Sequence, residues 1–351
     1  MHTHIIASFC ISQACHTRLN LLQMTLWLTR EDVNRLLDMP AAIDAVAGAY
    51  RSIHLGEAEL PVRSNIPVSA HGGSLMTMPA YLGGEVDALG AKLISFYGAN
   101  PAERGLPAIQ GKVVLFDPAT GGLWAFIDAE ILTAMRTGAA GGVAARHLAR
   151  GDARILTIFG SGAQAPYQVE AAICERPIDQ VLVISRRTEN AAAMAAQITS
   201  RFDVSARAAP DAEEAVRAAD IIVTATSAHE PLFDGGLLQP GVHVTGIGSH
   251  VPEACEVDAT ALGRAKVVVD QRSACLAEAG DLIQPIGAGA YDAGQIYAEM
   301  GAIVAGDLPG RKDSSEITFF KSVGLAAQDL AVASLVYRRA VAEGAGLQLE
   351  A

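Results

Sequence analysis

The chain has 351 residues, half of them hydrophobic and only 5% aromatic, and its 26 Lys and Arg against 38 Asp and Glu give a net charge of −12. At roughly 150 residues per domain, this length predicts about two domains. A chain this acidic lacks the clustered positive surface that phosphate contacts need, so we exclude nucleic acid as a partner. The composition also excludes a disordered, collagen-like or disulfide-rich protein.

The cysteines of the chain are scattered and contain no Cys-x-x-Cys pair. This usage is typical of reduced, intracellular proteins, so we expect a cytoplasmic location. No uncharged apolar run approaches the roughly 20 residues that cross a bilayer, and we therefore expect no membrane association. The five positions are Cys10, Cys15, Cys174, Cys255 and Cys275.

Residues 1–23 contain a short apolar run, Ile5–Ile11, with neither a basic region before it nor a small-residue cleavage site after it. We therefore expect no signal peptide. We interpret residues 1–23 as a misassigned start or an extension without fixed structure, and Met24 as the better start. No strong metal-ligand spacing occurs here, and we predict no metal site. The side chains considered as ligands are His2, His4, Cys10, Cys15 and His16.

The segment from residue 25 to residue 150 predicts helices, then short strands, then a long helix. Thr29 followed by Glu31 and Asp32 is typical of a helix N-cap, and Pro40 is typical of a helix start. The predicted helices are Asp32–Leu37, Ala41–Leu55 and Ala129–Leu148, and the predicted strands between them are Ser74–Tyr81, Ala88–Phe96, Gly111–Asp117 and Leu123–Asp128.

From residue 152 strands alternate with helices, which predicts a parallel, doubly wound sheet. Ile155–Phe159 is a continuous apolar run, as expected of a strand buried on both faces. The tail, Glu316–Glu343, is rich in alanine, and we predict that it is helical. The other predicted elements are the helix Glu189–Arg201 and the strands Val181–Ser185, Ile221–Thr226, Val242–Ile247 and Lys266–Val269.

The strongest local motif is a Gly-x-Gly-x-x-Ala sequence at residues 160–165, between a predicted strand and a predicted helix. Gly160 allows the tight turn, Gly162 lets the backbone approach a pyrophosphate, and Ala165 keeps the helix close to the strand. The helix N-terminus then offers unpaired N–H groups to the phosphates. We therefore predict a dinucleotide site, against the alternative of a glycine turn in another α/β domain. The expected contacts are Gly160, Gly162, Ala163 and Gln164.

The end of the next predicted strand favours NADP(H). An NAD site usually has an Asp or Glu there for the ribose 2′-hydroxyl. This chain has Ser185, Arg186 and Arg187, which suit a 2′-phosphate. NAD(H) stays an alternative, since both arginines also fit a solvated helix start or stack on the adenine of either cofactor. Further cofactor contacts are expected where later strands end, at Thr224, Thr226, Ser227 and Ile247.

Three cations stand out in the apolar sequence of the first segment: Arg63, Lys92 and Arg136. Burying Lys92 within an apolar strand is costly unless it is paired or functional. Three converging cations would bind a substrate carboxylate, and a buried lysine also serves in proton transfer. The alternative is a lysine on an edge strand whose amine reaches water, together with two surface arginines.

These residues stand in segments that resemble the ornithine cyclodeaminase/mu-crystallin family of NAD(P)-dependent enzymes, over nearly the whole chain from Met24. The segment that begins at Glu316 is the most specific. The matching segments are Gly90-Ala-Lys-Leu-Ile, Asn100-Pro-Ala-Glu-Arg-Gly-Leu-Pro, Thr133-Ala-Met-Arg-Thr-Gly, Gly160-Ser-Gly-Ala-Gln-Ala and Glu316-Ile-Thr-Phe-Phe-Lys-Ser-Val-Gly-Leu-Ala.

The resemblance implies an α/β fold in which a Rossmann doubly wound sheet is inserted into an α+β substrate-binding and dimerisation domain. We expect the first domain at residues 24–150 plus 320–351 and the Rossmann domain at residues 151–319. The resemblance also implies a homodimer and a small imino or amino acid as substrate. Arg63, Lys92 and Arg136 match the carboxylate-binding cations of the family, and Thr137 matches a neighbour of the nicotinamide pocket.

The chain departs from the cyclodeaminase branch of the family at two positions. That branch uses a glutamate before a Leu-Met-Pro stretch and an aspartate in a Gly-Gly-Asp segment, and here Met76 and His250 stand in their places. The distal amine of ornithine would lose both acidic partners, so we disfavour ornithine cyclodeaminase activity. His250 is a candidate proton donor or contact to a polar substrate arm, and the alternative is a loop histidine without a role in chemistry.

The expected activity is NAD(P)H-dependent reduction of a small 2-imino acid to an L-amino acid, with a cyclic ketimine such as pyrroline-2-carboxylate or piperideine-2-carboxylate favoured. Lys92 and His250 are the candidate catalytic residues, because either is able to relay the proton. The alternatives are an alanine-type amino-acid dehydrogenase, a linear iminodiacid reductase, the cyclodeaminase lyase and a non-catalytic binding protein.

Overall fold

A computed structural model describes residues 24–350, which form two compact units. Unit 1 comprises residues 24–37, 58–132 and 329–350, and unit 2 comprises residues 38–57 and 133–328. The interpretation of residues 1–23, including the ligands considered there, lies outside the described residues. No helix in the described part of the chain combines the length and the apolar character needed to span a membrane.

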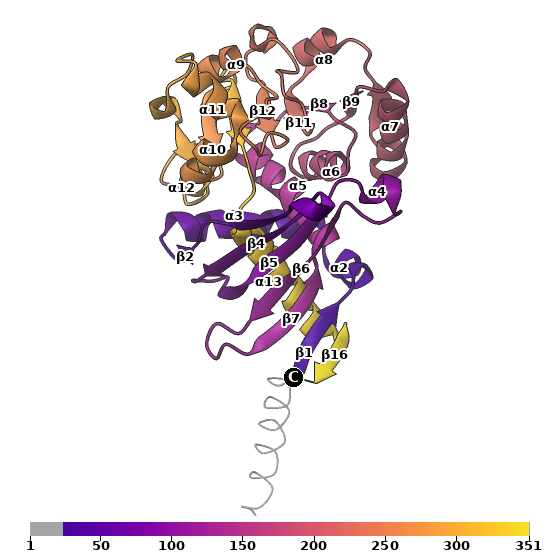
Figure 1. The fold of residues 1–351 in the computed structure, drawn as a ribbon. Helices are drawn as coiled ribbons and strands as arrows, with labels where there is room; N and C mark the ends of the chain where they lie inside the picture. Colours follow the sequence, from indigo (N-terminus) through magenta and orange to yellow (C-terminus); the bar gives the residue numbers. More distant parts are fainter. Residues whose placement is uncertain (1–23, 351) are drawn as a thin grey trace, which may run out of the picture. The chain divides into compact units, whose positions relative to one another are not determined.

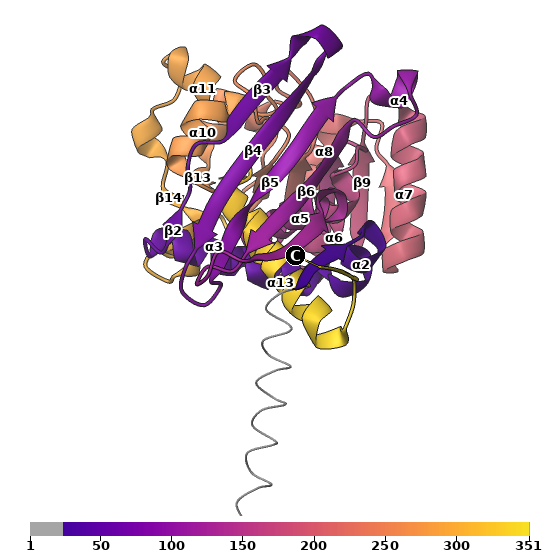
Figure 2. The ribbon, with the colours of Figure 1, turned by 60° about the horizontal axis from the view of Figure 1, so that its bottom comes forward.

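Unit 1 is built on an eight-stranded sheet in the order β16-β1-β7-β6-β5-β4-β2, with β3 paired to β4 outside this path. The β1–β7 pair is parallel and all other pairs of the sheet are antiparallel. Figure 2 shows the long strands β3 to β6 side by side. The strands are β1 (Met24–Leu28), β2 (Ala58–Glu59), β3 (Ser64–Val68), β4 (Gly73–Leu82), β5 (Ala88–Tyr97), β6 (Ile109–Phe116), β7 (Leu123–Asp128) and β16 (Leu347–Glu350).

Residues 329–343 of helix α13 (Ala326–Glu343) cover one face of this sheet. Gly90 of β5 lies so close to the helix that a Cβ there would come within 3.1 Å of Leu330 Cδ2. Farther along the helix, the ring of Tyr337 stacks on Trp124 with 5.0 Å between centroids. Unit 1 also contains the short helices α2 (Arg30–Leu36), which Thr29 caps as predicted, and α4 (Asn100–Glu103).

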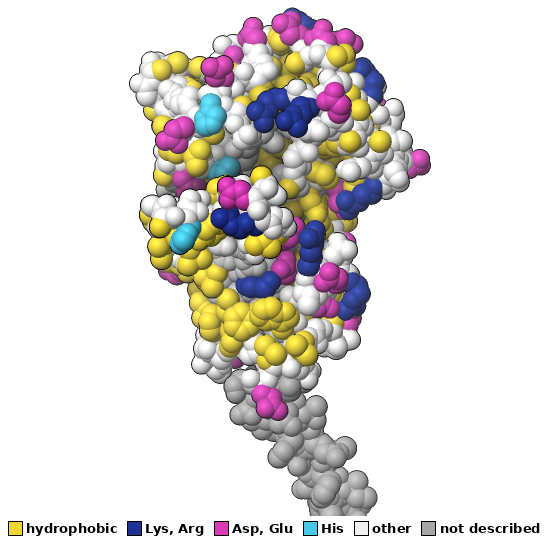
Figure 3. All heavy atoms as spheres, turned by 45° about the vertical axis from the view of Figure 1, so that its right-hand side comes forward, with side chains coloured by type: hydrophobic (Ala, Val, Ile, Leu, Met, Phe, Trp, Pro, Cys, Tyr) yellow, Lys and Arg dark blue, Asp and Glu magenta, His cyan; other side chains and the backbone are white. Residues whose placement is uncertain are grey.

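The opposite face of the unit 1 sheet exposes apolar side chains. Ile66 of β3 is paired with Leu75 of β4, and both are exposed. Leu93 of β5, opposite Thr77, lies on the same face and is also exposed. Figure 3 shows that hydrophobic side chains (yellow) are also exposed in the lower part of that view.

Unit 2 contains the predicted parallel sheet, in the order β10-β9-β8-β11-β12-β15-β13-β14 (Figure 1). Chain order runs outward from β8 in one direction and from β11 in the other, except that β15 is inserted between β12 and β13. The sheet therefore has a topological switch point between β8 and β11, which is where such folds bind ligands. The strands are β8 (Ile155–Phe159), β9 (Gln180–Ile184), β10 (Ser205–Ala208), β11 (Ile221–Thr224), β12 (His243–Gly246), β13 (Lys266–Val269), β14 (Ala298–Glu299) and β15 (Thr318–Lys321).

Small residues let three helices of unit 2 pack closely. Gly142 of α5 lies against Ile43 of α3 and Ala171 of α6, so that a Cβ at residue 142 would clash with the Ile43 side chain. Arg146 then joins the same three helices through Asp44 at 2.8 Å and Glu175 at 2.7 Å. The longer helices are α3 (Met39–His54), α5 (Ala129–Leu148), which begins in unit 1, α6 (Ala165–Glu175) and α7 (Thr188–Phe202), and the shorter ones are α8 (Ala212–Ala218), α9 (Ala259–Arg264), α10 (Arg272–Glu278), α11 (Gly280–Gly287) and α12 (Met300–Val304).

The prediction of a helix throughout Glu316–Glu343 was wrong in its first part. Thr318–Lys321 forms β15, which lies between β12 and β13, and α13 begins only at Ala326. Every residue of β15 is buried, including Lys321, because both faces of a central parallel strand are covered. The strand was missed because the helix was predicted from the alanine content of the whole tail, and because the apolar run of β15 ends in a lysine.

The domain bounds expected from the sequence differ from the two compact units. Residues 38–57 and 133–150, expected in the first domain, group with the parallel sheet because α3 and α5 pack on α6. The expected boundary at residues 319 and 320 falls inside β15. The assignment of functions to these domains stays a prediction.

Candidate functional site

A cavity of about 870 Å³ lies where β8, β9 and β11 end, next to the switch point of the unit 2 sheet. Seven of the residues predicted for the cofactor line it, and they come from three separate loops. Sequence reasoning missed several others, among them Asn190 and Leu232, which stand outside any recognised motif. The predicted residues in the lining are Gly160, Gly162, Ser185, Arg186, Arg187, Thr226 and Ser227.

The glycine turn after β8 has the geometry that phosphate binding needs. Gly160 has a φ of 113°, and a Cβ at this position would collide with the carbonyl oxygen of Ala225. The unpaired N–H groups predicted for the first turn of α6 are not found, because Ala165 N–H donates to the Gly162 carbonyl oxygen at 3.1 Å and Pro166 has no N–H. The helix therefore offers the turn the positive end of its dipole. These features fit the pyrophosphate of a dinucleotide.

The loop after β9 has positive charge and hydroxyl groups. Ser185 Oγ lies 2.9 Å from Ser161 Oγ of the glycine turn, which joins the two loops. Arg186 and Arg187 are exposed on the cavity wall. No Asp or Glu is among the residues that line the cavity. This wall therefore fits an anionic group beyond the ribose.

Five other residues predicted for the cofactor lie outside the cavity lining: Thr137, Ala163, Gln164, Thr224 and Ile247. Thr224 is fully buried, and its hydroxyl donates to Glu256 Oε2 at 2.8 Å. Thr137, on α5, donates its hydroxyl to the Thr133 carbonyl oxygen at 2.7 Å.

The buried lysine predicted in unit 1 has an acidic partner. Lys92 Nζ lies 2.6 Å from Asp329 Oδ2, and the two side chains are 1% and 0% exposed. Lys92 is on β5 and Asp329 is on α13, which covers that face of the sheet. The sequence contains no signal that pairs residues this far apart, so Asp329 was missed. The alternative of an edge-strand lysine that reaches water does not apply.

Arg136 of α5 is held by a buried network in unit 2. Its Nη1 donates to Gln328 Oε1 at 2.6 Å, and Gln328 Nε2 donates to the Tyr50 hydroxyl at 2.6 Å. Burial, and then the nearby Asp270 carboxylate, raises the pKa of Tyr50 well above its ordinary value, so its hydroxyl stays protonated. Gly324 has a φ of 81°, and a Cβ there would collide with Arg136 Nη1. The alternative of a surface arginine therefore does not apply to Arg136.

The remaining predicted site residues lie on or beside strands. Arg63 is half-buried and directly precedes β3. Met76 is in β4, opposite Asn65 and Ile94. His250 is exposed in the loop after β12, and its Nδ1 lies 2.8 Å from the Gly248 carbonyl oxygen. Arg63 and Lys92 belong to unit 1 whereas Arg136 belongs to unit 2, so the convergence of the three cations stays a prediction.

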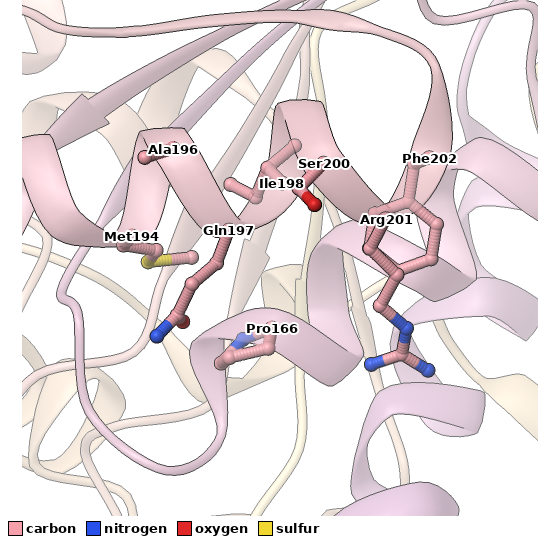
Figure 4. A pocket seen from close by; sticks show the side chains of 8 residues that line it. All are labelled: Pro166, Met194, Ala196, Gln197, Ile198, Ser200, Arg201 and Phe202. Atoms are coloured by element: carbon pink, nitrogen blue, oxygen red, sulfur yellow. The ribbon is translucent and has the colours of Figure 1, made fainter.

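A second cavity, of about 530 Å³, lies on unit 2 beside α6 and α7 (Figure 4). The one charged residue that lines this cavity is Arg201. It pairs with Glu170 at 2.6 Å and lies over the Phe202 ring, so Glu170 neutralises its charge. We assign no ligand to this cavity. Within residues 24–350, no group of three or more His, Cys, Asp or Glu side chains is placed to hold a metal ion.

Comparisons with known proteins agree with this geometry. The sequence profile of the ornithine cyclodeaminase/mu-crystallin family matches residues 23–344. The chain belongs to this family. The resemblance and the fold class predicted from the sequence are therefore confirmed.

Among the relatives in this family is the Delta(1)-pyrroline-2-carboxylate reductase of Bacillus cereus, which is 38% identical over 92% of this chain and 99% of its own length. The Thermococcus litoralis Delta(1)-pyrroline-2-carboxylate reductase, solved in complex with NADH and L-proline, is also 38% identical and superimposes with a TM-score of 0.88 over 93% of this chain and 100% of that one. An archaeal alanine dehydrogenase dimer with bound NAD is 35% identical, with a TM-score of 0.86 over 93% and 99%.

Proposed function

We propose that this protein reduces a cyclic 2-imino acid such as pyrroline-2-carboxylate to the corresponding L-amino acid. It is an NAD(P)H-dependent oxidoreductase that acts on C=N or CH–NH bonds, the reaction class implied by the sequence and borne out by the relatives. The observation that carries the substrate is the full-length similarity, at 38% identity, to two pyrroline-2-carboxylate reductases, one of them holding NADH and L-proline.

The glycine turn and the loops after β9 and β11 hold the dinucleotide in this proposal. The glycine turn and the positive end of the α6 dipole receive the pyrophosphate, because the lack of a Cβ at Gly162 suits close approach. Ser185, Arg186 and Arg187 favour NADP(H) over NAD(H), since they offer donors to a 2′-phosphate and no carboxylate for a free 2′-hydroxyl. When bound, the reduced cofactor supplies the hydride for the imine carbon.

Arg63, Lys92 and Arg136 bind the substrate carboxylate in this proposal. Buried cations interact strongly with an anion because little water screens them. Asp329 and Gln328 keep Lys92 and Arg136 in fixed orientations, so little ordering is needed when the anion binds. Fixed orientation of the carboxylate in turn orients the imine carbon, which is the main catalytic contribution of these side chains.

Lys92 and His250 are the groups proposed to transfer the proton of the imine nitrogen. Lys92 Nζ lies beside the Asp329 carboxylate, which stabilises the protonated amine before it donates its proton to the substrate. In His250, Nδ1 donates to the Gly248 carbonyl oxygen, so Nε2 is the ring nitrogen left to contact the substrate. Its position in the loop after β12 places it at the carboxyl edge of the parallel sheet.

The second candidate is an amino-acid dehydrogenase of the alanine type, which the similarity to the archaeal alanine dehydrogenase favours. A linear iminodiacid is a third substrate class for the same chemistry. Ornithine cyclodeaminase activity stays disfavoured, because Met76 and His250 replace two acidic residues of that branch.

We also propose a homodimer that forms through the apolar face of the unit 1 sheet. Ile66, Leu75 and Leu93 lie exposed on that face, and exposed apolar patches mark interaction sites. The dimeric state of the archaeal alanine dehydrogenase supports this assembly. A cytoplasmic location is proposed because Cys174, Cys255 and Cys275 are free thiols.

Absorbance at 340 nm tests the function directly. We would follow oxidation of NADPH and NADH with pyrroline-2-carboxylate, piperideine-2-carboxylate, pyruvate plus ammonia, and oxaloacetate plus ammonia. We expect the cyclic ketimines to be reduced, faster with NADPH. Turnover only with a keto acid plus ammonia would assign the second or third candidate. Ammonia release from ornithine without net cofactor oxidation would overturn the proposal in favour of the lyase.

A further inference from the structure

A fully buried carboxylate, Glu256, ties together two loops at the carboxyl edge of the unit 2 sheet. Its Oε1 accepts hydrogen bonds from the backbone N–H and the hydroxyl of Thr226, both at 2.7 Å. Its Oε2 accepts from the Thr224 hydroxyl and from the Gly248 N–H, both at 2.8 Å. Thr224 ends β11, whereas Gly248 follows β12. One side chain therefore fixes the ends of two neighbouring strands.

These bonds determine the shape of one wall of the cofactor cavity. Thr226, Ser227 and Ala228 line the cavity. The Thr226 hydroxyl donates to Glu256 and accepts from the Ala228 N–H at 3.2 Å, so the carboxylate orients the whole turn. Gly248 approaches so closely that a Cβ there would collide with Glu256 and with the Thr226 carbonyl oxygen. Glu256 itself is not among the lining residues.

Glu256 is held by a second buried layer. Asp281 Oδ1 accepts from the backbone N–H of Glu256 at 2.6 Å and of Val257 at 3.2 Å. Asp281 Oδ2 lies 2.8 Å from Lys321 Nζ, and both side chains are 0% exposed. Buried charges are costly unless they are fully paired, and such pairing fixes their geometry. A continuous chain of bonds thus runs from Lys321 of β15 to the turn at Thr226.

We propose that Glu256 is a positioning residue for the dinucleotide: it acts through Thr226 and Gly248 to hold the turn at residues 226–228 in the form that binds cofactor. The inference rests on the proposed function, because it requires a dinucleotide in this cavity. If Glu256 has this role, its substitution weakens cofactor binding by more than the loss of protein stability explains.

Glu256→Gln is the variant that tests the inference. It keeps the size of the side chain but replaces one acceptor oxygen by an NH₂ group, which must face a backbone N–H of Thr226 or Gly248 and cannot accept from it. We expect the Kd for NADPH, measured by fluorescence titration of the purified protein, to rise about tenfold or more. The same titration is made with NADH, whose Kd is expected to rise by a similar factor.

Asp258→Asn is the matched control. Asp258 also accepts two backbone N–H groups, from Gly235 at 3.0 Å and from Ala261 at 2.7 Å, but it does not contact the cavity. We expect it to lower the Tm while the Kd for NADPH stays within about twofold of the wild-type value. If both variants weaken binding in proportion to their loss of Tm, Glu256 has a structural role only and the inference is overturned.

Thr224→Val provides a second variant in case Glu256→Gln does not fold. It removes one hydroxyl donor to Glu256 at a buried position outside the cavity lining. We expect a smaller rise in Kd, about threefold, and an unchanged Kd would count against the inference. A wild-type protein that binds neither NADPH nor NADH would overturn the proposed function, whereas tight wild-type binding that both variants retain would overturn only the role of Glu256.

Discussion

Asp329 holds Lys92 at 2.6 Å in a place where neither side chain meets solvent, and the residue directly before it, Gln328, holds Arg136 at the same distance. Two consecutive residues near the start of α13 thus orient two of the three cations that we assign to the substrate carboxylate. The partner of Lys92 is a carboxylate, whereas Gln328 offers Arg136 a neutral amide. The start of α13 therefore fixes the orientation of both cations, one through an ion pair and one through a hydrogen bond.

The Asp329→Ala variant should lose both activity and stability. It leaves the Lys92 ammonium buried without its carboxylate, and breaking a buried pair in this way costs about 3–5 kcal/mol of unfolding free energy. Chemical denaturation measures this loss, and a change below about 1 kcal/mol would contradict the buried pair.

A double variant separates stability from function. Lys92→Met combined with Asp329→Leu replaces the ion pair by apolar groups of similar size, which is often neutral for stability. We expect the unfolding free energy to return close to the wild-type value while imine reduction stays abolished. Activity in this double variant would remove Lys92 from the site.

Arg136→Ala should lose most activity and keep the affinity for cofactor. Its guanidinium is proposed to bind the substrate carboxylate, and it is not among the residues that line the dinucleotide cavity. We expect kcat/KM for the imino acid to fall about 100-fold or more, with the Kd for NADPH unchanged. Steady-state kinetics and fluorescence titration measure the two quantities, and unchanged turnover would contradict the assignment.

Removal of both arginines after β9 should change the choice of cofactor. In the Arg186→Ala/Arg187→Ala variant we expect the KM for NADPH to rise about tenfold or more and the KM for NADH to change little, because only NADPH has the 2′-phosphate. Arg217→Ala, an exposed charge loss on α8 outside the cavity, serves as control. An equal rise in KM for both cofactors would show that the arginines contact a part common to both.

Acid should destabilise unit 2 through His243. This histidine is fully buried, with Nδ1 2.9 Å from Thr318 Oγ1 and Nε2 2.9 Å from Thr245 Oγ1, and burial lowers its pKa from 6.5 to about 3. Between these two pKa values His243 is protonated in the unfolded chain and neutral in the folded protein. The contribution of a neutral His243 to the free energy of unfolding is fully present above pH 6.5. It is lost as the pH falls toward 3, by up to about 1.4 kcal/mol per pH unit.

Urea unfolding at a series of pH values checks this dependence. A His243→Gln variant keeps polar atoms at the position but cannot titrate, so its unfolding free energy should fall less steeply between pH 6.5 and 4 than that of the wild type. Because both proteins contain the same other titrating groups, the difference between their slopes of unfolding free energy against pH reports on His243 alone. A loss of stability that is the same at every pH does not change the slope. Equal slopes would contradict a neutral, buried His243.

Ile66→Asp should shift the protein from dimer to monomer. Ile66 is 55% exposed on the apolar face of the unit 1 sheet, where a charge would have to be desolvated in an interface. Light scattering after size-exclusion chromatography measures the molar mass. Leu308→Asp, at an exposed apolar position of unit 2, should leave the mass unchanged. A wild-type monomer would contradict the proposed assembly.

The features that could be predicted from the sequence are those carried by neighbouring residues. Ile155–Phe159 and the glycines after it predicted a strand and a tight turn, and both are present. A cavity lies at this turn, and its occupation by a cofactor stays a prediction. The alternation of strands and helices likewise predicted the parallel sheet. These patterns are local because a tight turn and a buried strand impose their requirements on consecutive residues.

The features that sequence reasoning missed join residues far apart in the chain. Lys92 was recognised as unusual, but its partner Asp329 could not be named because pairing depends on how α13 crosses the sheet. Glu256 has no local pattern, and only the structure brings it beneath the turn at Thr226. The strand β15 was read as helix because its burial comes from its neighbours β12 and β13 rather than from its own composition.

The pairing of β1 with both β7 and β16 has a consequence for synthesis on the ribosome. Strand β1 emerges first and lies between two partners, the second of which is made only at residues 347–350. The nascent chain must keep an unpaired strand edge and a lysine without Asp329 while all of unit 2 is being translated. We therefore expect unit 2 to fold first and unit 1 to close only once β16 has been made.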